Sequence, residues 1–141
     1  MKRSFYLAIV CALALVAAAC GSDSATTAPS TTPVATAGTE TFTGTMAKGG
    51  TAYRFFTASA AGTVNVTLVT TGPSATLLGM GIGIPGTNPG SCDLTKTVQA
   101  REGSTPQLSA TVDPGFYCAG VFDVGAVAST GVIVTMTVAH P

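Results

Sequence analysis

The chain has 141 residues and a formal net charge of zero, with 9% of its residues charged and 46% hydrophobic. Six basic residues are balanced by six acidic ones, so the chain lacks the basic excess of nucleic-acid-binding proteins, and we expect no nucleic acid partner. Because charges are scarce, solubility must come from Thr, Ser and Asn.

The first 19 residues have the pattern of a secretory signal peptide. A Lys-Arg pair follows Met1, an apolar run extends from Phe5 to Ala19, and small residues directly precede Cys20. This run of about 15 residues is shorter than the roughly 20 that a membrane-spanning helix needs. We therefore expect residues 1–19 to be removed and no permanent transmembrane helix to remain.

The segment around Cys20, Leu-Val-Ala-Ala-Ala-Cys-Gly-Ser, resembles the lipobox of bacterial lipoproteins. Ala17 departs from that pattern, because Leu is usual at its position. The resemblance implies that Cys20 is acylated with a fatty acid such as palmitate and that this lipid anchors the chain to a membrane. Ordinary secretion with cleavage near Ala19 is the alternative. We expect a location in the bacterial cell envelope at the outer membrane, with the domain facing the periplasm or the cell surface.

The cysteine count supports this interpretation. The chain has four cysteines, and Cys11 lies in the segment that is removed, which leaves an odd number in the mature chain. If Cys20 carries lipid, Cys92 and Cys118 remain and are expected to form a disulfide in an oxidising compartment. Without a CxxC spacing or neighbouring histidines, these two thiols are not expected to bind zinc.

Residues 20–39 are expected to form a tether and residues 40–141 a single folded domain. After the lipidated cysteine the tether is almost entirely Gly, Ser, Thr, Ala and Pro. It has too little apolar surface to offset the entropy of ordering, so we expect it to be disordered and fairly extended.

The domain has the pattern of an all-β protein. Short runs of Val, Thr, Ile and Phe are separated by Gly, Pro, Asp and Asn at roughly 8- to 12-residue intervals, and helical periodicity is absent. Glycines at 79, 81 and 83 share one face of a strand, which predicts close packing on that backbone or a bend. The expected strands cover residues 40–45, 52–57, 62–70, 78–84, 96–101, 107–112, 116–122 and 132–138.

A motif near Tyr117 tests for an immunoglobulin domain. Residues 113–118, Asp-Pro-Gly-Phe-Tyr-Cys, are similar to the D-x-G-x-Y-x-C stretch of that fold, in which the tyrosine hydroxyl bonds back to the backbone. Here Cys118 directly follows Tyr117, so the two side chains point to opposite faces of a strand. Cys92 is also too close along the chain, and no Trp is present, so a true immunoglobulin domain is disfavoured.

A second resemblance is to the bacterial pre-peptidase C-terminal domain. The segments that carry it cover residues 53–57, 62–68, 114–117, 121–123 and 134–138. The Cys92 and Cys118 pair is not required of that family. The resemblance implies a single antiparallel, jelly-roll-like β-sandwich of about eight strands, acting as a non-catalytic accessory module associated with secretion or with binding of extracellular polymers.

Residues for catalysis are scarce, and we expect no enzyme, no cofactor and no bound metal. His140, the one histidine, is the penultimate residue, a poor position for a rigid general base. Asp93, Glu102, Asp113 and Asp123 show no spacing of a carboxylate pair or a calcium loop and are expected to be solvated turn residues.

Two further motif matches are also discounted. Residues 81–86 match G-x-G-x-x-G, but Pro85 and Pro89 prevent the helix that a dinucleotide site needs, so a strand running into a turn is expected. The sequon at Asn65 is expected to be ordinary strand.

Two functions from different classes remain open. One is a lipid-anchored envelope module with a structural or protein-interaction role, and the other is a polysaccharide-binding module. Carbohydrate modules stack sugars on exposed aromatic rings, whereas here we expect the core to take most of the phenylalanines, together with Tyr53 and Tyr117.

Overall fold

The computed structural model describes residues 37–72 and 75–141, whose regular structure is eight β-strands. All eight expected strands are present. The largest shift is at the fifth, which begins at Cys92, four residues before the expected start at 96. The strands are β1 (Gly38–Met46), β2 (Thr51–Ala58), β3 (Gly62–Gly72), β4 (Leu78–Pro85), β5 (Cys92–Ala100), β6 (Leu108–Val112), β7 (Gly115–Asp123) and β8 (Val132–His140).

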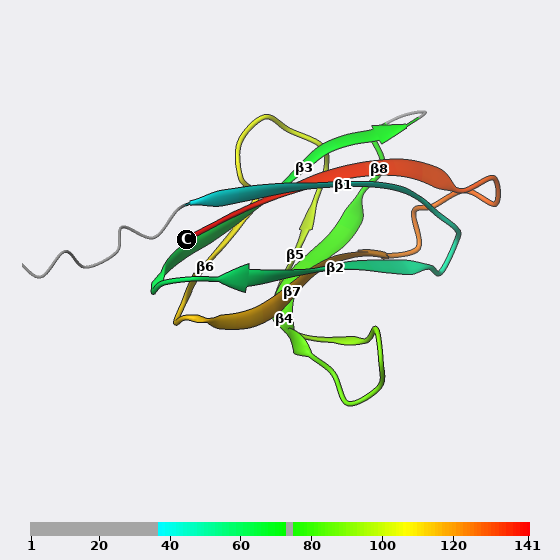
Figure 1. Ribbon diagram of the computed structural model, residues 1–141. Coiled ribbons are helices and arrows are strands. Elements are labelled where there is room, and N and C mark those ends of the chain that lie inside the picture. The colour runs from blue at the N-terminus through cyan, green and yellow to red at the C-terminus, as the bar shows by residue number, and fades with distance from the viewer. Residues whose placement is uncertain (1–36, 73–74) are drawn as a thin grey trace, which may run out of the picture. The chain divides into compact units, whose positions relative to one another are not determined.

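The strands form two antiparallel sheets of four, ordered β1-β8-β3-β6 and β2-β7-β4-β5. Each strand of the first half of the chain pairs with its counterpart counted from the end: β1 with β8, β2 with β7, β3 with β6, and β4 with β5. This nested order is that of a jelly roll. It confirms the predicted all-β sandwich, and Figure 1 shows β1, β8 and β3 in one layer, with β2, β7 and β4 in the other.

The core lies between the two sheets and is almost entirely aliphatic. Alternate residues of β3 and β8 are buried, as the two-residue periodicity predicts, whereas in β4 all six residues from Leu78 to Gly83 are buried. The largest fully buried side chains are Leu68, Leu78, Met80, Met136, Val64, Val66, Val121, Val134, Val138 and Cys118. In β5 and β7, by contrast, apolar residues occupy both faces, and this places several of them outside the core.

Tyr117 forms the backbone bond that its motif suggests, although the topology is that of a jelly roll. Its hydroxyl donates a hydrogen bond to the carbonyl oxygen of Asp113 at 2.9 Å, and its ring packs against the core. Cys118 points to the opposite face of β7, as expected from the direct succession of the two residues.

Candidate functional site

The outer face of the β2-β7-β4-β5 sheet carries four aromatic side chains. In β2, Phe56 belongs to the core, so Tyr53 and Phe55 point outward. In β7, Tyr117 points inward, which places Phe116 and Phe122 on the outer face. The side chains of Tyr53, Phe55, Phe116 and Phe122 are called the aromatic face below.

The aromatic face corrects the expectation that the core takes most phenylalanines. Phe56 is buried, and Phe42 and Tyr117 pack against the core, but Phe116 is 55% exposed. Two adjacent phenylalanines in one strand cannot both face the same core, because successive side chains point to opposite faces. The pair at 55 and 56 is therefore the sequence signal that could have revealed this face.

Glycines make room on the sheet for two of the aromatic rings. A Cβ atom at Gly79 would lie 2.1 Å from Cε2 of Phe122, and a Cβ atom at Gly120 would lie 2.4 Å from Cδ1 of Tyr53. Each ring therefore occupies the space above a glycine of the neighbouring strand. The close packing that the glycines of β4 predict is confirmed.

Phe116 and Phe55 form the floor of an open pocket. Their ring centroids are 5.7 Å apart, and the ring planes are inclined by 21°. The wall is formed by Pro85 at the end of β4 and by residues 86 and 88–91 of the β4–β5 loop, which covers residues 86–91. The pocket has a volume of about 290 Å³, close to the lower limit for sites that hold small ligands.

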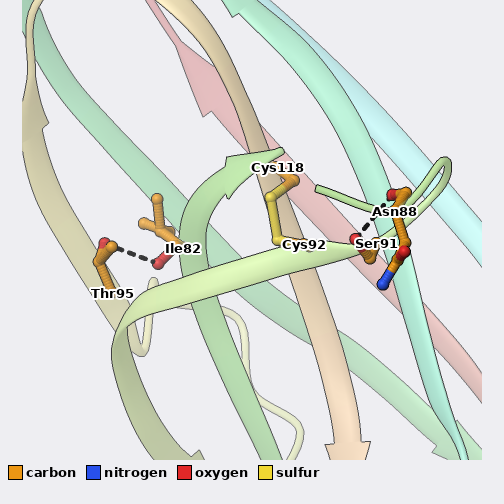
Figure 2. The surroundings of a disulfide bond; sticks show 6 residues. All are labelled: Ile82, Asn88, Ser91, Cys92, Thr95 and Cys118. Atoms are coloured by element: carbon orange, nitrogen blue, oxygen red, sulfur yellow. Dashed lines mark hydrogen bonds between the residues drawn. A yellow bond between two sulfur atoms is a disulfide. The ribbon is translucent and has the colours of Figure 1, made fainter. Parts of the chain in front are cut away.

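A disulfide fixes the end of loop 86–91 to β7. Cys92 and Cys118 are joined with a Cα–Cα distance of 6.0 Å, as the cysteine count predicts, and Figure 2 shows the bond beside the loop. The bond connects β5 to β7, the two strands that flank β4. Gly83 lets the backbones of β4 and β5 come close together here, because a Cβ atom at Gly83 would lie 2.0 Å from the carbonyl oxygen of Asp93.

Hydrogen bonds within loop 86–91 define its turn. The backbone N–H of Gly86 donates to the carbonyl oxygen of Ser91 at 2.9 Å, and the N–H of Ser91 donates to that of Asn88 at 3.0 Å. The Ser91 hydroxyl also donates to the Asn88 carbonyl, at 2.7 Å (Figure 2). The G-x-G-x-x-G match is therefore a strand running into a turn, as expected.

Asp123 binds backbone N–H groups of two loops. Its Oδ1 accepts hydrogen bonds from the N–H groups of Gly125, Ala126 and Val127, and its Oδ2 accepts one from Gly49 at 2.8 Å. The Gly49 N–H, with the other three, holds the pKa of this carboxyl below its ordinary value. Because backbone N–H groups donate to both of its oxygens, the carboxylate links the two loops and is not arranged as a ligand for calcium.

Of the other candidate carboxylates, one already accepts hydrogen bonds and another lies far from Asp123. Glu102 accepts hydrogen bonds from the backbone N–H and the hydroxyl of Thr71, which corrects the expectation of a merely solvated turn residue. Asp113 and Asp123 flank β7 at opposite ends, roughly 30 Å apart at the rise of an extended strand. A glycosidase-like pair of these two carboxylates is therefore excluded.

His140 is packed into the sandwich at the end of β8. Its side chain is 11% exposed, and its ring lies 5.1 Å from that of Phe56. Nε2 lies 3.8 Å from Oε1 of Glu40, whose other oxygen binds Arg54 at 2.9 Å. The ring is therefore held more rigidly than its position near the chain end predicts.

The remaining sequence-based site predictions have different outcomes. Cys20 and the lipobox lie outside the described residues. Within residues 37–72 and 75–141, no group of three or more His, Cys, Asp or Glu side chains could hold a metal ion. In the same part of the chain, no helix is long and apolar enough to cross a bilayer. Asn65, the residue of the sequon, lies in β3 and accepts a hydrogen bond from Ser109 at 2.6 Å.

Comparisons with known proteins do not place the chain in a family. No protein-family model and no curated protein matches it. A similar solved structure is that of PliG from Aeromonas hydrophila, a periplasmic lysozyme inhibitor of g-type lysozyme. The two chains are 22% identical, and the alignment covers 74% of this chain and 84% of that one with a TM-score of 0.44. A similarity at this level assigns no function to the chain.

Proposed function

We propose that the protein is a non-catalytic, lipid-anchored module of the bacterial cell envelope that binds another envelope protein through the aromatic face. The exposure of Phe116, stacked on Phe55 beside the cross-linked loop 86–91, carries this proposal. Contiguous exposed apolar surface marks interaction sites, and aromatic residues are enriched at the centres of protein interfaces. Such aromatic side chains contribute most of the binding energy when they fill pockets on the partner.

The anchor at Cys20 is supported by the lipobox-like context and by the pairing of the two cysteines of the domain. Metabolic labelling with palmitate tests it. We expect Cys20→Ala to abolish incorporation, and Cys11→Ala, a change within the signal peptide, to leave the label unchanged. Full labelling of the Cys20→Ala protein would refute the anchor.

A non-catalytic role is supported by how the polar candidates are used. The carboxylates of Asp123 and Glu102 bind backbone groups, and the His140 ring is packed against Phe56. The resemblance to the pre-peptidase C-terminal domain, which implies an accessory module, also supports a non-catalytic role. The structural role of each side chain leaves it a poor general acid or base.

Polysaccharide binding is the second candidate, favoured by the aromatic side chains on one face of a sheet, because carbohydrate modules stack sugars on exposed aromatic rings. Retention on peptidoglycan and common polysaccharides separates the two functions. Our proposal predicts no sugar-competed retention. Saturable, sugar-competed retention that is lost in Phe116→Ser and kept in Ile133→Ser would overturn it, because Ile133 is equally exposed, at 56%, on the other sheet.

A further inference from the structure

The two sheets end in four edge strands. In the strand order, β1 and β6 are the edges of one sheet, and β2 and β5 are the edges of the other. Among the described residues, no further strand lies beside any of these edges. The outer N–H and C=O groups of an edge strand can pair with another extended chain, so natural proteins protect edges by shortness, bulges, proline or charge. These features show which edges of this domain are open.

The edges β5 and β6 are protected. Thr95 of β5 is passed over in the register with β4, and such a bulge disturbs a strand as a template. On the other sheet, β6 has only five residues. Lys96 of β5 donates from Nζ to the carbonyl oxygen of Ser109 in β6, which places an ammonium group between the two edges. Neither edge is therefore a regular template for a further strand.

The edges β1 and β2 are long and regular. β1 has nine residues and pairs with β8 without a register shift, and β2 has eight and pairs with β7 in the same way (Figure 1). Neither strand contains proline. Each has one charged residue, and these two, Glu40 and Arg54, bind each other at 2.9 Å. Both edges can therefore accept a strand.

A second copy of the chain can extend a sheet only where like faces meet. Two copies of one edge strand pair antiparallel about a two-fold axis, and directly opposite residues then lie on the same face of the joined sheet. A shift of the register by one residue turns every side chain to the wrong face. The possible registers are therefore limited by which residues of the strand face the core.

β2 does not meet this condition. A register that uses all of its residues places Arg54 of one copy, on the core side, opposite Phe55 of the other copy, on the outer face. A shift by one residue in one direction places Arg54 opposite Arg54, and like charges directly opposite are destabilising. A shift in the other direction places Arg54 opposite the buried Phe56. Pairing of β2 with its own copy is therefore disfavoured.

β1 meets the condition. The middle of its nine residues is Phe42, so a two-fold axis there pairs every residue of Gly38–Met46 with a residue of the same face. Glu40 of one copy then lies opposite Gly44 of the other, and the two carboxylates do not meet. Each Glu40 carboxylate also keeps its ion pair with Arg54 of its own copy. Of the two open edges, β1 is therefore the one that is complementary to itself.

The threonines of β1 line up in the same register. All four, at positions 39, 41, 43 and 45, are exposed. Thr41 of one copy lies opposite Thr43 of the other, and Thr39 lies opposite Thr45 in the same way. The sheet already contains such a pair, because the Oγ1 atoms of Thr43 and Thr135 lie 3.2 Å apart between β1 and β8. Cross-strand threonine pairs stabilise antiparallel strands, so this register continues the pairing pattern of the sheet.

We infer that the protein forms a dimer in which β1 of one copy pairs antiparallel with β1 of a second copy, centred on Phe42. The two four-stranded sheets then form one continuous sheet of eight strands. The aromatic face lies on the other sheet of each copy, so the dimer carries two such faces. The inference goes beyond the proposed function and does not depend on it.

Cysteine cross-linking tests the pairing on the full-length protein in detergent micelles. Thr41→Cys of one copy faces Thr43→Cys of the other, whereas two copies of either variant meet only diagonally, too far apart for a disulfide. We expect a mixture of the two variants to form a disulfide-linked dimer under mild oxidation, and each variant alone to form much less. A mixture of Ser109→Cys and Thr111→Cys, on the protected edge β6, is the matched control and should not cross-link.

Sedimentation velocity adds a test without cysteines. The wild-type protein should sediment as a dimer, and Thr43→Lys as a monomer with an unchanged circular dichroism spectrum, because a lysine on an edge strand opposes strand addition. Thr111→Lys, on β6, should stay dimeric. A monomeric wild-type protein, a dimeric Thr43→Lys variant, equal cross-linking of the β1 and β6 mixtures, or single variants that cross-link as well as their mixture would overturn the inference. So would a photo-cross-linker at position 43 that captures another protein in place of a second copy.

Discussion

Removal of the disulfide tests how loop 86–91 is held. The bonded cysteines are 26 residues apart, and in the chain-entropy model a loop of this length restricts the unfolded chain by about 3.5 kcal/mol at 25 °C. Cys118 is fully buried and Cys92 is 7% exposed, so replacement of both by Ala also removes packed sulfur atoms. We expect the double variant to lose about 3 to 5 kcal/mol of unfolding free energy, much of the stability of a typical small domain.

Urea unfolding of the full-length protein, followed by circular dichroism, measures this loss. The reduced wild-type protein should lose most of the same free energy as Cys92→Ala/Cys118→Ala, because both lack the cross-link, and it should be slightly more stable because it keeps the packed sulfur atoms. The reductant should have no effect on the double variant, which serves as the control. A loss below about 1 kcal/mol would refute the assignment of the bond as the main constraint on this part of the fold.

Three further changes test individual contacts. The pKa of Asp123 is lowered by the Gly49 N–H and the other donors, so its stabilising effect is present above the unfolded pKa of about 3.9 and is lost as the pH falls through the folded pKa. Asp123→Asn should therefore flatten the acid-unfolding curve, and an unchanged curve would contradict this. Gly79→Ala should place a Cβ atom in the Phe122 ring and cost about 1 to 3 kcal/mol in urea unfolding, unless the ring swings outward, which a changed NMR ring environment would reveal. Tyr117→Phe should lose about 1 kcal/mol with its hydrogen bond to Asp113, and unaltered stability would show that bond to be unimportant.

The strands could be predicted because turn residues separate them and because several, such as β3 and β8, alternate in polarity. Val64, Val66 and Leu68 are buried as this alternation predicts. The start of β5 could not be predicted, because Asp93 is a poor strand former and its pairing with Ile84 of β4 depends on the fold and the disulfide. The jelly-roll order came from a family resemblance, since pairing of strands far apart in the chain leaves no local signal.

The candidate site was less predictable than the fold. Hydrophobicity alone assigns a phenylalanine to the core, whereas the face of the strand decides where it lies, as the adjacent residues Phe55 and Phe56 show. The bond of Asp123 to Gly49 joins loops 74 residues apart and is invisible in the local sequence. The disulfide could be predicted because it follows from a count of cysteines and not from geometry.

Site-specific photo-cross-linking in living cells tests the central claim most directly. A benzoylphenylalanine introduced at Phe116 and, separately, at Ile133 samples two positions of nearly equal exposure, 55% and 56%, on opposite sheets. The account predicts a discrete protein adduct from position 116 that is absent from position 133. No protein adduct at 116, equal adducts at both positions, or an adduct to a glycan at 116 would contradict it.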